Sequence, residues 1–113
     1  MTVISVFVPY FDSVVLGSAH RRPWIAESAA QARLSVPDVP DYSPVFLTLD
    51  ACREWIAWLI TRSPWFAGPD RPVEIREVVA RTHRYGDQPW TWVTPANGVP
   101  WEYQLNVPRH QAV

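Results

Sequence analysis

The sequence predicts a single α+β domain over residues 1–113: an antiparallel or mixed sheet of four to five strands with one main helix packed on it. The length of 113 residues suits one domain and is too short for two ordinary ones. Hydrophobic residues make up 48% of the chain and charged residues 19%, a balance that excludes a disordered protein. One strongly helical segment stands between several strand-like segments, which favours the mixed class.

The first expected strand is Thr2–Val8, whose sequence TVISVFV is almost wholly β-branched or aromatic and stops at Pro9. A run of this kind is typical of a strand that is buried on both faces. The pattern of residues 10–23 favours no single structure, although Val14–Leu16 allows a short second strand.

Pro23 and the helix-forming residues after it indicate a second short helix over about residues 24–34, because proline is favoured at the first position of a helix. The next segment, Ser35–Pro44, contains three prolines. It therefore predicts an extended, polyproline-like connection and neither a helix nor a central strand.

Residues 49–62 form the main predicted helix, preceded by a short strand at Val45–Leu47. Thr48 is a good N-cap, Asp50 places negative charge in the first turn, and Ser63-Pro64 ends the run. The apolar side chains span roughly 200° of the helix, whereas a helix on one sheet needs about 100°. Either a second element covers the helix, or one flank is exposed. The apolar positions are Ala51, Cys52, Trp55, Ile56, Trp58, Leu59 and Ile60.

Val73–Thr82 is the next predicted strand, and its alternation breaks at Glu77-Val78, as a β-bulge would produce. Asn97-Gly98 then predicts the turn of a hairpin over residues 90–107. The resulting aromatic face either forms the core under the main helix or is a platform on which sugars or single-stranded nucleic acid stack. We favour the core, because a half-buried antiparallel sheet needs such a face. The face carries Trp90, Trp92, Trp101, Tyr103 and Leu105.

The sequence assigns no catalytic residue, metal ligand or cofactor site. Cys52 is the one cysteine, and it lies in the middle of the apolar arc, where a buried structural thiol is expected. His20, His83 and His110 lack the spacing of a metal site. Residues 83–87 place His, Arg and Asp together, but no second cluster completes an acid–base pair. No glycine-rich phosphate loop and no nucleophile elbow occur.

The charge balance argues against nucleic acid and membrane partners. The net charge is −1, and no strongly basic stretch is present. No signal peptide and no membrane-spanning run are recognised, and one cysteine cannot form an internal disulfide, so a cytoplasmic protein is expected. All ten basic residues are arginine, which is typical of a GC-rich genome and favours a bacterial or phage origin.

These features together favour a non-enzymatic protein that binds a protein partner or associates with itself, of accessory, inhibitor or immunity type. The expected contact residues are the exposed aromatic side chains Trp58, Trp65 and Phe66. The alternative is a ligand-binding module that uses the aromatic platform Trp90, Trp92, Trp101 and Tyr103.

Overall fold

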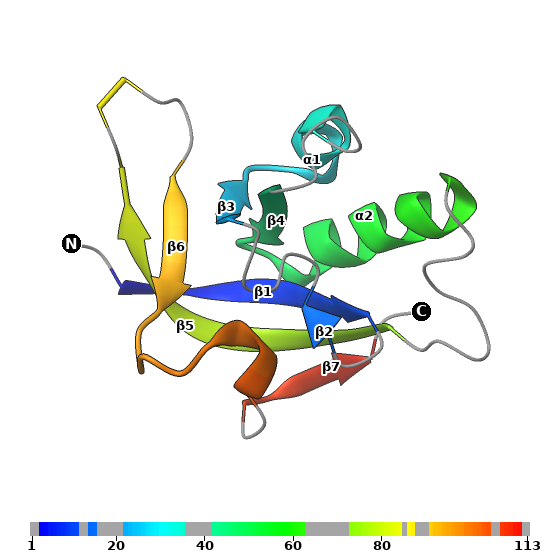
Figure 1. Ribbon diagram of the computed structural model, residues 1–113. Helices are drawn as coiled ribbons and strands as arrows, with labels where there is room; N and C mark the ends of the chain where they lie inside the picture. Colours follow the sequence, from blue (N-terminus) through cyan, green and yellow to red (C-terminus); the bar gives the residue numbers. More distant parts are fainter. Residues whose placement is uncertain are drawn as a thin grey trace.

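The computed structural model confirms a mixed α+β fold with one main helix packed on a sheet (Figure 1). Two helices and one 3-10 turn accompany the described strands. The structure describes residues 3–11, 14–15, 22–35, 42–62, 73–84, 86–87, 91–104 and 107–111. In chain order, the elements are β1 (Val3–Phe11), β2 (Val14–Val15), β3 (Arg22–Ala26), α1 (Ala29–Ser35), β4 (Tyr42–Phe46), α2 (Leu49–Arg62), β5 (Val73–His83), β6 (Trp92–Pro95), η1 (Trp101–Tyr103) and β7 (Arg109–Gln111).

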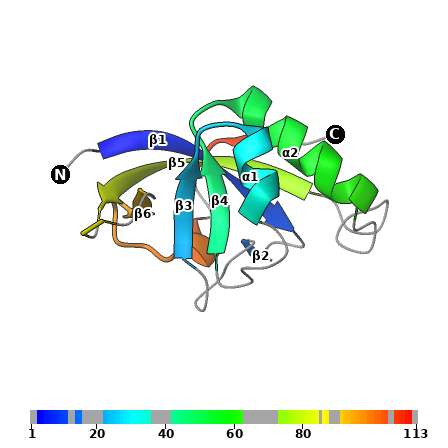
Figure 2. The same cartoon turned by 90° about the horizontal axis from the view of Figure 1, so that it is seen from above.

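Five of the described strands close into a barrel in the order β1-β4-β3-β6-β5, because β5 pairs again with β1. β3 and β4 run parallel, and the other neighbouring strands in the ring run antiparallel. The short strands β2 and β7 add to β1 and β5. Figure 2 shows β3 and β4 side by side, crossing the direction of the β1–β5 ladder. The sequence predicted a sheet of four to five strands but did not predict that the sheet closes into a barrel.

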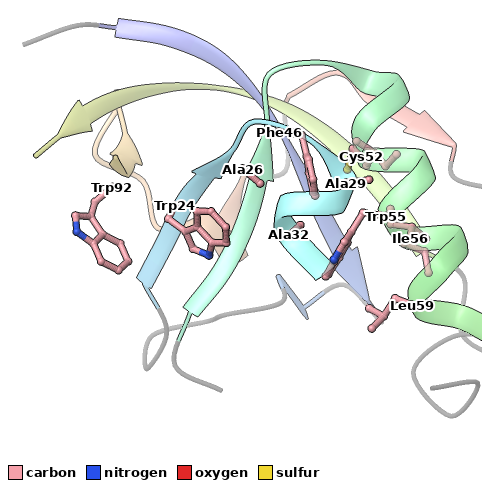
Figure 3. Close-up of a cluster of buried hydrophobic side chains, with 12 residues drawn as sticks. Trp24, Ala26, Ala29, Ala32, Phe46, Cys52, Trp55, Ile56, Leu59 and Trp92 are labelled. Carbon is pink, nitrogen blue, oxygen red and sulfur yellow. The ribbon is translucent and has the colours of Figure 1, made fainter. Parts of the chain in front are cut away.

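The barrel wall separates two buried clusters, because successive side chains of a strand point to opposite faces. The inner cluster fills the barrel and consists of Val6, Val8, Tyr10, Val45, Val78, Ala80, Val93 and Trp101. The outer cluster lies between the wall and the helices, as the close-up of Figure 3 shows. It consists of Trp24, Ala26, Ala29, Ala32, Phe46, Cys52, Trp55, Ile56, Leu59, Val73, Ile75 and Trp92.

Helix α2 has the bounds that its sequence predicts, Leu49–Arg62. Its N-cap is also confirmed, since the Ala51 amide donates to Thr48 Oγ1 at 3.2 Å. The wide apolar arc is explained by α1, which packs beside α2. Arg33 of α1 lies 3.7 Å from Glu54 of α2 in an ion pair between the two helices. A second element therefore covers the helix.

The prediction of a helix over about residues 24–34 is wrong in its first half. Residues 22–26 form β3, which pairs in parallel with β4, and α1 begins at Ala29. Local helix propensity is a weak preference, and the pairing with β4 overrides it. Tyr42–Phe46 likewise lies between β1 and β3, so the expectation of no central strand fails for its first three residues.

β3–α1 and β4–α2 are two copies of one unit, spaced 20 residues apart. The parallel register joins Arg22 to Tyr42 and Ala26 to Phe46, which is the same spacing as between the helix starts Ala29 and Leu49. The amide of Gln31 donates to Ser28 Oγ at 3.1 Å, so Ser28 caps α1 as Thr48 caps α2. Each strand thus ends two residues before a hydroxyl N-cap.

The predicted β-bulge in β5 is absent, because the β1–β5 register runs without a break from Val3–Arg81 to Phe11–Val73. The alternation breaks for another reason. Val73 and Ile75 are buried on the outer face, whereas Val78 and Ala80 are buried inside the barrel. The buried apolar residues of β5 therefore change from the outer face to the inner face at the point where the outer cluster ends.

The predicted hairpin pairing over residues 90–107 is also wrong. Asn97-Gly98 does lie in a turn, and Gly98 has the positive φ of 73° that favours glycine there. However, Thr94 pairs with Arg81 of β5 and not with Trp101, which lies in η1. The turn therefore leads into a 3-10 segment that closes the barrel interior, and not into a returning strand.

Candidate functional site

An open area of the barrel wall lies on the outer face of β1 and β5. Val3 and Val79 are each 54% exposed there. Val3 pairs with Arg81, and Ser5 pairs with Val79, so the two valines are diagonal neighbours roughly 7–8 Å apart. The expectation that the first strand is buried on both faces is thus wrong for its beginning. At the other end of the ladder, the same face is buried in the outer cluster.

Charged and polar side chains complete this area, which we call the outer β1–β5 patch: Val3, Ser5, Glu77, Val79 and Arg81. Arg81 is exposed and has no hydrogen-bond or ion-pair partner among the described residues. Glu77 accepts a hydrogen bond from Ser5 Oγ at 2.8 Å, and its second oxygen lies 3.3 Å from His110 Nε2 of β7. The patch therefore presents apolar groups beside one positive charge that has no partner in the described part of the chain, and one negative charge that is hydrogen-bonded.

The arrangement of Ser5, Glu77 and His110 does not activate the serine as a nucleophile. The carboxylate stands between the hydroxyl and the imidazole, so the serine donates to Glu77 and has no histidine at its oxygen. A serine nucleophile needs a base positioned to take its proton, in most cases a histidine. The ring of His110 also packs edge-on against Phe7, with 5.6 Å between the centroids. These contacts attach β7 to β1 and β5.

The predicted contact residue Trp58 is half-buried. The guanidinium carbon of Arg33 lies 5.6 Å from the centre of its ring, in a cation–π contact between α1 and α2. Trp65 and Phe66 lie outside the described residues. The structure thus does not present Trp58 as the fully exposed anchor that the sequence suggested.

The structure does not bring the predicted aromatic platform together. Trp92 is buried in the outer cluster, and Trp101 is buried in the inner cluster on the other side of the barrel wall. Tyr103 is 65% exposed, and Trp90 lies outside the described residues. The shared face required Trp101 to pair with Thr94, and that pairing is absent. Trp92 and Trp101 are core residues, as the favoured interpretation expected, but they belong to two separate clusters and not to one shared face.

Cys52 is fully buried, as expected of a structural thiol. Burial raises the pKa of this thiol far above its usual range, and the nearby charge of Arg53 lowers it by less. The reactive thiolate is therefore unavailable in the folded protein.

The structure describes His83, Arg84, Gly86 and Asp87 of the cluster at residues 83–87. His83 Nε2 lies 2.7 Å from Thr94 Oγ1, while Arg84 and Asp87 are exposed. His20 lies outside the described residues. The described residues also include no group of three or more His, Cys, Asp or Glu side chains that could hold a metal ion.

Sequence reasoning missed a buried arginine at one end of the barrel. Arg76 donates from Nη1 to the Gln104 carbonyl at 2.6 Å and from Nη2 to Glu74 Oε2 at 3.2 Å. Its guanidinium carbon lies 4.6 Å from the centre of the Tyr10 ring, and the Tyr10 hydroxyl donates to the Trp101 carbonyl at 2.5 Å. Glu74 and Arg76 share the inward parity of Val78, but the sequence alone does not show which face of this strand points inward.

These contacts fasten the segment of residues 97–104 to the barrel. The side-chain amides of Asn97 and Gln104 bond reciprocally at 3.0 and 3.2 Å, and Gln104 Nε2 also donates to the Val99 carbonyl at 2.6 Å. The two central side chains of this network, Arg76 and Gln104, are buried. We therefore interpret the network as structural.

No protein-family model matches the chain, and no curated protein or solved structure matches it. Among the described residues, no helix is long and apolar enough to cross a membrane.

Proposed function

We propose that this protein is non-enzymatic and acts by binding another polypeptide, as an accessory, inhibitor or immunity-type protein. The outer β1–β5 patch is its contact surface. The observation that carries the proposal is the exposure of Val3 and Val79 on adjacent strands, because the same face is buried at the other end of the β1–β5 ladder.

The composition of the patch supports a protein partner. A solvated face of an antiparallel sheet normally carries polar side chains, and isolated exposed apolar residues are common. Here, however, two exposed valines are diagonal neighbours on paired strands, and they lie beside an arginine that has no partner among the described residues. Apolar groups with arginine at their margin are typical of protein contact surfaces.

Site-specific photo-crosslinking in cells tests this proposal. A benzophenone side chain is placed at Val79 and, in a second variant, at Ser5. The control position is Ala57, which is exposed on α2 and lies outside the patch. We expect protein adducts after irradiation from Val79 and Ser5, and none from Ala57.

A second substitution makes the test specific to the patch. Val79→Arg, combined with the probe at Ser5, introduces a charge in the apolar centre and should abolish the adduct, while circular dichroism shows an unchanged fold. If neither patch position gives an adduct, or if Ala57 gives the same adduct, the outer β1–β5 patch is not the contact surface.

A further inference from the structure

We propose that the partner of the outer β1–β5 patch is a second copy of this chain, packed face to face and antiparallel about Val79. This inference depends on the proposed function, because it concerns the same surface. Its basis is the order of charges along β5.

Glu77 and Arg81 stand two residues before and two residues after Val79, on the same outward face. At about 3.3 Å per residue, the two charged positions are roughly 13 Å apart with the exposed valine between them. A two-fold axis in the plane of contact, perpendicular to β5 at Val79, places each residue opposite its counterpart at equal distance on the other side. Val79 then faces its own copy, and Arg81 of each copy faces Glu77 of the other.

The same axis also matches the residues of β1. Val3 is level with Arg81, and Phe7 is level with Glu77. Val3 of one copy therefore lies opposite the half-buried Phe7 of the other, and Ser5 lies opposite its copy. Apolar groups meet apolar groups, and each positive charge meets a negative charge, as a self-complementary two-fold interface requires.

The charges also select one orientation. If the axis ran along β5, Arg81 would face Arg81, and Glu77 would face Glu77. Like charges placed together disfavour an interface. The unpaired state of Arg81 within the described part of one chain leaves it available for the opposite copy.

The small size of the patch determines the expected affinity of the dimer. Stable interfaces bury about 800 Å² on each partner, and five residues provide less than that. We expect a weak, reversible dimer with a dissociation constant on the order of 0.1 mM. Salt should weaken it, because its two Arg–Glu pairs are at an exposed surface.

Sedimentation equilibrium of the full chain, from about 1 µM to about 1 mM at low and high salt, tests the dimer. The wild-type protein should change from monomer to dimer over this range. Val79→Arg and Arg81→Glu should each weaken association at least about tenfold. Arg84→Glu makes the same charge change at an exposed arginine outside the patch and should leave association unchanged.

A charge-exchange experiment tests whether Glu77 and Arg81 face charged residues of the opposite copy. Arg81→Glu and Glu77→Arg each place like charges opposite one another in their own dimers. A mixture of the two variants restores two opposite-charge contacts and should form a heterodimer. Because Glu77 also bonds Ser5 and His110, the Glu77→Arg variant is first checked for folding. If it does not fold, the single variants Val79→Arg and Arg81→Glu test the interface.

The outcomes separate this inference from the proposed function. A wild-type protein that stays monomeric at about 1 mM and low salt overturns self-association. So does dimerisation of Val79→Arg with wild-type affinity, or a folded charge-exchange pair that does not associate. If position 79 then crosslinks to a different protein, the patch is still a binding surface. If it crosslinks to nothing, both proposals fail.

Discussion

Replacing Arg76 by methionine tests whether the buried guanidinium holds the segment of residues 97–104 against the barrel. Methionine retains an unbranched side chain of similar length but cannot donate a hydrogen bond. The substitution leaves the Gln104 carbonyl without its charged donor and removes the cation–π contact with Tyr10. Glu74 loses an ion-pair partner but is 35% exposed, so water can solvate it.

The expected cost follows from these contacts. A hydrogen bond from a charged donor to a buried carbonyl contributes about 1.5–3 kcal/mol, and a desolvated cation–π contact contributes about 0.5–2 kcal/mol. Removing a buried charge offsets part of this loss, because the guanidinium no longer has to be desolvated. We expect Arg76→Met to lower the free energy of unfolding by about 2–3 kcal/mol, and Arg76→Ala by about 2 kcal/mol more through the space it leaves.

Urea denaturation measures these differences, and hydrogen exchange locates them. The amides of Tyr103 and Gln104 donate to the carbonyls of Pro100 and Trp101, so their exchange reports on this segment. In Arg76→Met their exchange should accelerate more than that of the β1–β5 ladder.

The control is Arg109→Met, because Arg109 is exposed and lies 3.8 Å from the same carboxylate. It should cost less than about 0.5 kcal/mol. An Arg76→Met variant within about 0.5 kcal/mol of the wild type, with unchanged exchange at residues 103–104, would refute the role given to the guanidinium.

Three further predictions concern single side chains. Native Cys52 should resist alkylation until the protein is unfolded. Since its thiol stays protonated in the folded state, the unfolding free energy of the wild type should also fall relative to Cys52→Ala above about pH 8.5, by up to 1.4 kcal/mol per pH unit; a parallel pH profile would contradict this. Thr48→Ala should destabilise by about 1 kcal/mol in thermal unfolding and Thr48→Ser by much less, because only alanine removes the cap; equal losses would exclude capping. Gly98→Ala should cost about 1 kcal/mol and Gly98→Asn less in the same assay, since an added Cβ meets no atom within 4 Å and only the positive φ opposes it; equal costs would point to another cause.

Local signals were sufficient to predict α2 and most of β5. Thr48, Asp50 and the proline after Arg62 are close in sequence to the helix they delimit, so no distant contact is needed to recognise its ends. The β-branched run from Val73 likewise identified a strand. Its pairing partners and the face that each residue uses depend on the distant strands β1 and β6, and the sequence pattern does not contain them.

Tertiary pairing explains the elements that were misjudged. Pro23 suits the first turn of a helix, yet it lies in β3 because β4 pairs with it. The hydroxyl residues Ser28 and Thr48, 20 positions apart, are the signal that would have placed the helix start correctly. At Asn97-Gly98 the sequence predicted the turn, but the outcome beyond it depends on the buried side chain of Gln104.

The candidate surface was the least accessible to sequence reasoning. Val3 and Val79 look like core residues of two strands, and nothing local shows that the outer cover ends before them. Arg81 is recognised as part of this surface only from the strand register, which places it beside Val3. The tryptophan count pointed to an aromatic surface, whereas Trp24, Trp55, Trp92 and Trp101 are all buried.

The β1–β5 ladder has a consequence for the order in which the protein is made. Its paired residues are separated by 62 to 78 positions in the chain. At a synthesis rate of about 5–20 residues per second, β5 is made roughly 3–16 s after β1. β1 therefore waits without its main partner, with an apolar β-branched segment open to other nascent chains. Expression at a high rate should therefore lower the yield of folded protein more than its final stability suggests.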